Sequence, residues 1–143
     1  MSEIYTDGSA IPNPGRGGYA VIKNGRPIAL GTEDNSTNIR MEAQALIHAF
    51  ALAEDGDSII TDSEFWLNVL TKWAPTWQKN GWKKKSGEIK NLELVKELYA
   101  AYTAHPNVKI QWTRSHVGTE GNELADQWAN KAREGATIAE VEG

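Results

Sequence analysis

The stretch YAVIKNGRPIAL, residues 19–30, has two apolar runs separated by Asn24-Gly25. Asn-Gly is the dipeptide that two-residue β-turns favour, so this stretch predicts a β-hairpin. Before it, EIYTDGSA at 3–10 predicts another strand that ends in turn residues. A loop at 11–18, with two prolines and three glycines, is expected between them. The first part of the chain therefore predicts three strands in an antiparallel meander.

Helical and extended patterns alternate after the hairpin. Ser36, Thr37 and Asn38 are possible N-caps for a helix over 39–54, and SIITD at 58–62 predicts a short buried strand. Residues 63–73 predict a helix that Pro75 ends or restarts, since proline fits only the first turn of a helix. A helix over 91–104, a strand over 108–112 and a helix over 121–133 follow. We expect an α/β fold with a five-stranded mixed sheet flanked by helices.

The composition limits the classes of protein. The 143 residues favour a single domain, and 40% hydrophobic and 24% charged residues are ordinary for a soluble globular protein. The absence of cysteine excludes disulfides and thiolate chemistry. The chain shows no leader pattern and no apolar run of the roughly 20 residues that a membrane helix needs. We expect a cytoplasmic protein with no membrane contact and a flexible tail over 135–143.

Positive charge is concentrated in one segment, although the formal net charge is −4. Residues 79–90 contain five lysines and one glutamate, a local charge of about +4. Two tryptophans accompany these lysines in WQKNGWKKKSGEIKN, residues 77–91. This distribution excludes a uniformly basic nucleic-acid-binding protein but allows a polarised one.

Four acidic residues occupy positions that folding alone does not require. Asp7 lies in a strand, where aspartate is disfavoured, and Asp62 ends an apolar strand, at the sheet edge where ligands bind in open α/β folds. Glu42 and Asp126 lie on predicted helices. Taken singly, these acids could instead cap a turn or a helix, favour a helix dipole, or face solvent.

If the fold brings the four carboxylates together, their repulsion requires cations. Oxygen ligands favour hard divalent ions such as Mg²⁺ or Mn²⁺. Paired ions roughly 4 Å apart recur in phosphodiester chemistry. The acids together indicate a metal-dependent site for phosphodiester chemistry.

Four blocks in the chain resemble type 1 ribonuclease H in their order. They are YTDGSA…NPGRGGYAVI (5–22), STNIRMEAQALIHAF (36–50), IITDSEF (59–65) and TRSHVGTEGNELADQWA (113–129). The resemblance implies the ribonuclease H-like fold and endonucleolytic hydrolysis of the RNA strand of RNA/DNA hybrids. It implies 5′-phosphate and 3′-hydroxyl products, Mg²⁺ as cofactor with Mn²⁺ as a substitute, and two ions when substrate is bound. A monomeric enzyme of bacterial or phage type is also implied.

The resemblance assigns roles to individual residues. The family's metal-binding acids match Asp7, Glu42, Asp62 and Asp126. His116 matches a loop histidine that assists proton transfer or product release, and Glu123 is a secondary candidate for tuning a metal. Contacts with the substrate are implied for Asn13, Thr37, Asn38, Arg40, Glu64, Trp73, Lys79, Trp82, Lys83, Lys84, Lys85 and Asn91.

The implied substrate contacts fall into three groups. Bases or RNA sugars would be contacted by Asn13, Asn38 and Glu64. A pocket for a DNA-strand phosphate would contain Thr37, Arg40 and Asn91. The segment 73–91 matches the family's basic protrusion, which grips the DNA strand; Trp73 is the candidate for stacking on a deoxyribose, Trp77 for packing within a helix, and the lysines for phosphates.

Two positions depart from the family's pattern. Many members have glutamine where this chain has Glu64, and a carboxylate cannot donate a hydrogen bond as an amide does. Asparagine is frequent where this chain has Ile39. Both departures leave details of the contact with the hybrid open.

Two other functions remain as alternatives. Integrases and resolvases share the sheet and cut DNA, but they lack the TDGS and GNELAD blocks in this register. A non-catalytic hybrid-binding module would gain nothing from clustered negative charge beside phosphates. The family motif begins within six residues of Met1, which leads us to expect a free enzyme.

Overall fold

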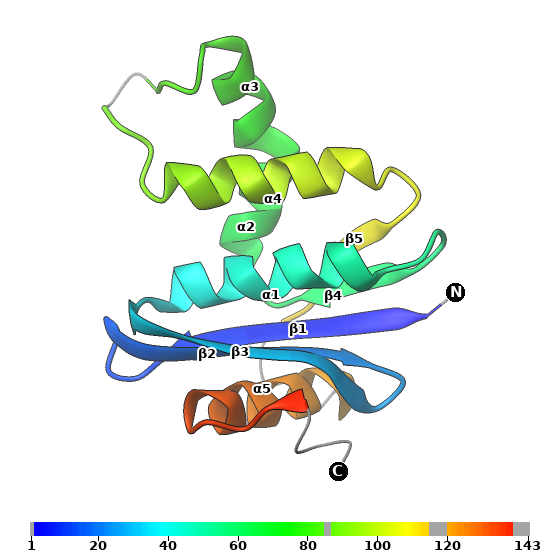
Figure 1. Cartoon of the computed structure of the whole chain (residues 1–143). Coiled ribbons are helices and arrows are strands. Elements are labelled where there is room, and N and C mark those ends of the chain that lie inside the picture. The colour runs from blue at the N-terminus through cyan, green and yellow to red at the C-terminus, as the bar shows by residue number, and fades with distance from the viewer. Residues whose placement is uncertain (1, 85–86, 115–119, 139–143) are drawn as a thin grey trace.

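The computed structural model describes residues 2–84, 87–114 and 120–138 (Figure 1). Strands β1 (Glu3–Ala10), β2 (Gly15–Lys23) and β3 (Arg26–Ser36) are followed by α1 (Asn38–Leu52) and β4 (Ser58–Thr61). Next come α2 (Glu64–Asn68), a π-helical turn η1 (Val69–Trp73) and α3 (Ala74–Lys79). The order ends with α4 (Leu92–Ala104), β5 (Lys109–Trp112) and α5 (Glu120–Arg133). Residues 139–143 of the predicted tail lie outside the described residues.

The strands form one five-stranded sheet in the order β3-β2-β1-β4-β5. The β1–β2 and β2–β3 pairs are antiparallel, whereas β1–β4 and β4–β5 are parallel. The predicted mixed sheet with an antiparallel meander is therefore confirmed. The central strand, β1, has one antiparallel and one parallel neighbour.

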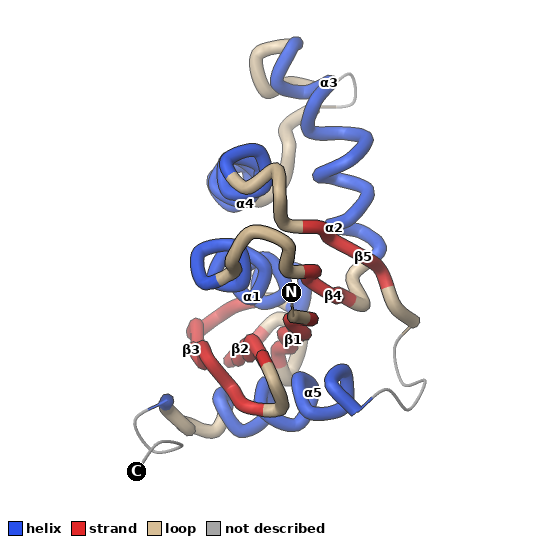
Figure 2. Tube along the Cα trace, turned by 90° about the vertical axis from the view of Figure 1, so that its right-hand side faces the viewer, coloured by secondary structure: helices blue, strands red, loops and turns tan. Residues whose placement is uncertain are grey.

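Helices cover both faces of the sheet. Helix α1 lies on one face and α5 on the other, while α4 packs on the outer side of α1 (Figures 1 and 2). The larger hydrophobic core lies on the α1 side and fully buries Phe50 and Trp66. The core beneath α5 is small and includes Ala125 and Ala129.

The hairpin is confirmed, but the predicted loop at 11–18 is too long. Asn24 (φ 55°) and Gly25 (φ 76°) form the turn, in the left-handed conformation that this turn requires. Strand β2, however, already begins at Gly15. A Cβ at Gly18 would lie 2.4 Å from the carbonyl oxygen of Ala129, so the absence of a side chain lets the α5 backbone lie directly against β2. Gly18 therefore belongs to a strand and allows a helix to pack closely on it.

Strand β3 extends beyond residue 30, where the sequence predicted its end. It continues to Ser36, which pairs with Gly15. Its last residues are polar and mostly exposed, because β3 is an edge strand of the sheet. Apolar periodicity alone does not detect a strand of this kind.

The single helix predicted over 63–73 is divided into α2 and η1. Pro75 has no N–H to donate to the carbonyl of Thr71, so an α-helical ladder cannot continue through it. It lies instead in the first turn of α3, as the sequence suggested. The π-helical turn joins α2 to α3 without leaving the helical path.

A buried carboxylate joins three segments at the start of β4. Asp57 is 1% exposed and accepts hydrogen bonds from the N–H of Ser2 (2.8 Å), the N–H of Glu54 (2.9 Å) and Nζ of Lys23 (3.1 Å). The hydrogen bonds from Glu54, Ser2 and Lys23 lower the pKa of Asp57 to about 2. The ionised carboxylate therefore stabilises the fold.

We expect Asp57→Asn to lower the free energy of unfolding at neutral pH by about 1–3 kcal/mol, because a charged hydrogen-bond acceptor is removed. The folded pKa is depressed, so this contribution is present above the unfolded pKa of about 4 and is lost as the pH falls toward about 2. Thermal melts of the two proteins should converge over that range. Asp55→Asn, at an exposed neighbouring position, is the control and should melt like the wild type.

Candidate functional site

Two acidic residues lie where the parallel pairing of β1 with β4 ends. Strand β1 pairs with β4 through Tyr5 and Ile60, and Asp7 lies two residues further along β1. Asp62 follows β4 directly. Because the carboxyl ends of parallel strands meet at one edge of a sheet, both side chains lie at that edge. Asp7 is 8% exposed there, in the interior of a strand rather than at a turn.

Glu42 reaches the same edge from α1. A Cβ at Gly8 would lie 2.3 Å from the carbonyl carbon of Met41 and 2.6 Å from the backbone nitrogen of Glu42. Any residue other than glycine would push α1 away from β1. Because Gly8 has no side chain, α1 can lie close enough to β1 for Glu42 to approach Asp7.

The acids form a cluster at this point. One carboxylate oxygen each from Asp7, Glu42 and Asp62 lies within 4.8 Å of the others. Asp126, half-buried on α5, is hydrogen-bonded to Asp7. All four line a cleft of about 300 Å³. The fold therefore brings together the four acids that the sequence singled out, from the interior of β1, from the end of β4 and from helices on opposite faces of the sheet.

Burial and repulsion both oppose ionisation of this cluster. Burial and the charge of Asp62 raise the pKa of Asp7 far above its usual range, and its hydrogen bond to Asp126 adds to the rise. The same two causes, burial first, raise the pKa of Glu42 to about 7, although a hydrogen bond to Ser63 opposes them. The cluster thus has more negative charge than the protein groups around it stabilise.

These residues fit a divalent cation. Converging carboxylate oxygens are the donors that Mg²⁺ and Mn²⁺ prefer. A cation among them would favour the ionised carboxylates and offset their repulsion. The donor set and its electrostatics therefore agree on a hard metal ion.

Local capping does not explain the acids. The cap of α1 is Thr37, whose Oγ1 accepts a hydrogen bond from the N–H of Arg40 at 3.1 Å. The cap of α2 is Ser63, whose Oγ accepts from the N–H of Trp66 at 3.2 Å. Glu42 lies beyond the first turn of α1.

Further polar residues surround the acids. Asn38 and Glu123 line the same cleft, as do Ser9, Asn122 and Gln127, which the sequence did not single out. Asn122 lies four residues before Asp126 on α5, so helical spacing places both on one face and could have identified it.

The remaining residues predicted near the RNA strand lie close by. The backbone N–H of Asn38 donates to Oδ1 of Asn13 at 3.3 Å, and its own Oδ1 accepts from the N–H of Ala10 at 2.7 Å. Glu64 is exposed at the start of α2, two residues after Asp62. His116 lies outside the described residues.

Arg40 joins the residues of the predicted phosphate pocket. Its Nη1 donates to Oδ1 of Asn91 at 3.1 Å, and Thr37 caps the helix that carries it. Two carboxylates missed in the sequence also bind this arginine: Oε1 of Glu33 lies 2.6 Å from Nε, and Oε1 of Glu93 lies 2.8 Å from Nη1. They come from β3 and α4, so only the tertiary structure pairs them with Arg40.

Aromatic residues line a groove beside the protrusion. Trp73 is 40% exposed and lines a groove of about 340 Å³ with Trp77, Lys84 and Lys90, among others. Phe65, which the sequence did not single out, lines it too; it is 42% exposed, and its ring centroid lies 5.9 Å from that of Trp73. A lone exposed aromatic near a helix start gives no periodic signal. Trp77 is half-buried and packs against the core, as predicted.

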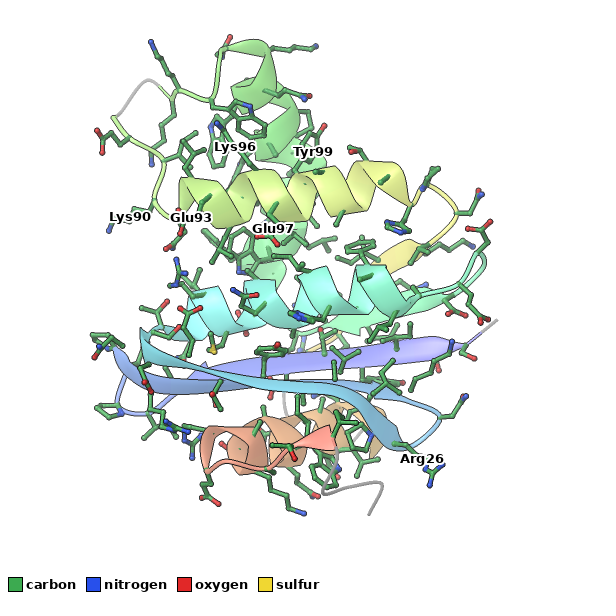
Figure 3. The ribbon with its side chains drawn as sticks, in the orientation of Figure 1. Arg26, Lys90, Glu93, Lys96, Glu97 and Tyr99 are labelled. Carbon is green, nitrogen blue, oxygen red and sulfur yellow. The ribbon has the colours of Figure 1, made fainter. Side chains whose placement is uncertain are left out.

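Trp82 is held within the protein. Its ring meets Tyr99 edge-on at 6.0 Å between centroids, and Nζ of Lys96 lies 5.7 Å from the ring centroid. Lys96 and Tyr99 lie on the side of α4 that faces α3 (Figure 3). Trp82 therefore fastens the protrusion to α4, and its predicted contact with substrate stays a prediction.

The lysines of the protrusion are available to a ligand. Lys79, Lys83 and Lys84 are exposed, which suits contacts with phosphates. Lys85 lies outside the described residues. Positive charge is thus presented on the protrusion, apart from the acidic cleft.

The model of the RNase H family matches residues 1–134. The chain belongs to the ribonuclease H family. Ribonuclease HI of Pseudomonas aeruginosa is 42% identical over 134 residues, which cover 90% of this chain and 90% of that relative. Ribonuclease H of Francisella philomiragia is 41% identical over 145 residues, covering 97% of this chain and 91% of the relative.

Solved structures agree with this ribonuclease H assignment. LC9-RNase H1, a type 1 RNase H with the type 2 active-site motif, has a TM-score of 0.80 and 30% identity, covering 95% of this chain and 73% of that one. The foamy viral protease-reverse transcriptase in complex with dsDNA has a TM-score of 0.81 at 21% identity, covering 94% of this chain and 95% of that one, and it shows the shared fold. The resemblance to type 1 ribonuclease H is thus confirmed.

As a ribonuclease H, the chain is an endoribonuclease that hydrolyses RNA in RNA/DNA hybrids. In the part of the chain that the structure describes, no helix combines the length and the apolar character needed to cross a membrane.

Metal-free ribonuclease H should lose stability as the pH rises from about 5 to about 8. The folded pKa values of Asp7 and Glu42 are raised, so the contribution of their protonated forms is complete below the unfolded values of about 4 and is lost as the pH rises through the folded ones. Saturating Mg²⁺ or Mn²⁺ should raise the Tm, and more so at the higher pH. Thermal melts with and without the cation, at about pH 5 and about pH 8, measure both effects. An equal rise in Tm at the two pH values would contradict binding of the cation by these carboxylates.

Proposed function

We propose that this ribonuclease H hydrolyses the RNA strand of RNA/DNA hybrids with Mg²⁺, or Mn²⁺ as a substitute, held by its four clustered acids. The observation that carries this proposal is the convergence of carboxylate oxygens from Asp7, Glu42 and Asp62 within 4.8 Å. Asp126 completes the set, and two ions are proposed when the hybrid is bound.

The protein's part in the reaction is to hold its ligands in fixed positions. When bound, such ions would activate a water for attack on the phosphorus and stabilise the leaving 3′ oxygen, and the products would carry 5′-phosphate and 3′-hydroxyl ends. Asp7 and Asp62 are fixed by the sheet, and Glu42 is oriented by its hydrogen bond to Ser63. Asp126 would exchange its hydrogen bond with Asp7 for a metal contact.

Two further residues are proposed to assist the reaction. We assign proton transfer or product release to His116. Glu123 is exposed on α5 and lines the acidic cleft, a position that suits tuning of a bound ion.

The RNA strand is proposed to lie at the acidic cleft. Asn13 and Asn38 are hydrogen-bonded to each other beside the acids, and Glu64 is exposed next to Asp62. Polar side chains at this place could contact the 2′-OH, the group that distinguishes RNA from DNA.

The DNA strand is proposed to follow the protrusion. Arg40, with Thr37 and Asn91, would hold one of its phosphates. The exposed rings of Phe65 and Trp73 would pack against a deoxyribose, since aromatic faces are common platforms for nucleic acid. Exposed lysines of the protrusion would bind neighbouring phosphates.

The two alternatives are less favoured. A DNA nuclease of related fold does not fit a match to the RNase H model over residues 1–134. A non-catalytic hybrid-binding module would be weakened by buried negative charge beside the substrate's phosphates. A single domain, a monomeric state and a cytoplasmic location remain predictions.

Asp62→Asn should abolish hybrid cleavage while keeping the fold, because it removes one charged metal ligand without changing the side-chain volume. Cleavage of labelled RNA/DNA hybrid, double-stranded RNA and double-stranded DNA is measured with Mg²⁺ and with Mn²⁺, and circular dichroism checks folding. Of these three substrates, the wild type should cut only the hybrid, and in the hybrid only the RNA strand. Cleavage of double-stranded DNA instead, or no cleavage in either metal, would overturn the proposal.

Lys83→Gln/Lys84→Gln should weaken hybrid binding and reduce the dependence of log K on log[salt] by about 0.9 for each phosphate that the variant no longer neutralises. Binding is measured in EDTA across a salt series, so that cleavage does not interfere. Lys109→Gln, on β5, is the control because it removes an exposed lysine away from the protrusion. A salt dependence that stays unchanged in the double variant would exclude these lysines from phosphate binding.

A further inference from the structure

Arg40 already binds two anions of its own protein. Its Nε donates to Glu33 at 2.6 Å, and its Nη1 donates to Glu93 at 2.8 Å and to Asn91 at 3.1 Å. The arginine proposed to hold a phosphate thus has Nε and Nη1 engaged before any substrate arrives.

The two carboxylates differ in exposure. The side chain of Glu33 is 28% exposed, and its second oxygen lies 3.5 Å from Nε2 of Gln44. The side chain of Glu93 is 69% exposed. Glu33 is therefore suited to orient Arg40 permanently, whereas Glu93 can rotate into solvent at little cost.

Glu93 lies among donors that would also suit an incoming anion. It lies in the first turn of α4, where Asn91, the N-cap, makes no capping hydrogen bond with its side chain and bonds Arg40 instead. The hydrogen bonds from Arg40 and from the backbone N–H of Glu93 itself hold the pKa of the Glu93 carboxyl below its usual range. A guanidinium and the N-terminus of a helix are donors that a phosphate also seeks.

The charges of the cluster favour exchange over addition. Arg40 is positive and both carboxylates are negative, so the cluster as it stands has a net negative charge. A phosphodiester brought beside it would be repelled. If Glu93 leaves, Arg40 and Glu33 balance, and one guanidinium donor becomes free for the phosphate.

We propose that Glu93 is a displaceable internal competitor that occupies Arg40 until a DNA-strand phosphodiester replaces it. It thereby lowers the affinity for the hybrid and makes the pocket select ligands that can displace a carboxylate. This inference rests on the proposed course of the DNA strand past Arg40.

The released carboxylate has other places to go. Its side chain is 69% exposed, so water can solvate it once Arg40 is released. Lys90 and Glu93 lie at the same end of α4 (Figure 3). Displacement therefore leaves no buried charge without a partner.

The test is hybrid binding by fluorescence anisotropy in EDTA, where no cleavage occurs. Glu93→Gln should tighten binding roughly two- to fivefold at low salt, the range expected for removal of one exposed ion pair that competes with the ligand. Glu97→Gln is the matched control: it removes the same charge one turn further along α4, where Glu97 is exposed and forms no ion pair with any residue that the structure describes (Figure 3). A gain in Glu97→Gln as large as in Glu93→Gln would overturn the proposal, because long-range charge would then explain both.

A double-mutant cycle with Arg40 isolates the competition. In an Arg40→Ala background, Glu93→Gln should improve binding no more than Glu97→Gln does; a full gain in that background would refute the proposal. If thermal melts show Arg40→Ala to be unfolded, Arg40→Gln replaces it. The cleavage assay on the wild type is a separate readout, so absence of hybrid cleavage would refute the proposed function without being confused with a negative cycle.

Discussion

Repulsion between carboxylates where the pairing of β1 with β4 ends is the constraint on which the rest of this structure depends. Asp7, Glu42 and Asp62 are held together by backbone pairing and by a helix lying directly on a strand, although burial raises the pKa of the first two. A fold that only had to be stable would keep such groups apart. The rigid sheet tolerates their repulsion, and a divalent cation converts it into a binding site.

The positive charge of the chain is arranged in response to this acidic centre. Exposed lysines are gathered on the protrusion, which Trp82 fastens to α4 by its contacts with Tyr99 and Lys96. Arg40 is already paired with two carboxylates, Glu33 and Glu93. A net charge of −4 thus conceals two surfaces of opposite sign, an acidic cleft and a basic protrusion.

Features that depend on local sequence could be predicted, whereas those that depend on tertiary contacts could not. Asn24-Gly25 predicts the hairpin, and the position of Asp62 at a strand end predicts the site. Both predictions are possible because turn chemistry and strand direction act over a few residues. The sequence places Gly18 in a loop, because the helix that requires it lies more than a hundred residues away. The partners of Arg40 and the role of Phe65 were missed for the same reason, since no local spacing indicates which side chains will meet.

The close packing of α1 on Gly8 and of α5 on Gly18 limits which substitutions this protein can accept. At these two points the helices that bring Glu42 and Asp126 to the cleft contact the sheet through main-chain atoms. The spacing of the acids therefore depends less on the identity of the core side chains. Mutational drift can repack the hydrophobic interior and alter stability while the geometry of the centre persists, but positions 8 and 18 themselves have no freedom to vary.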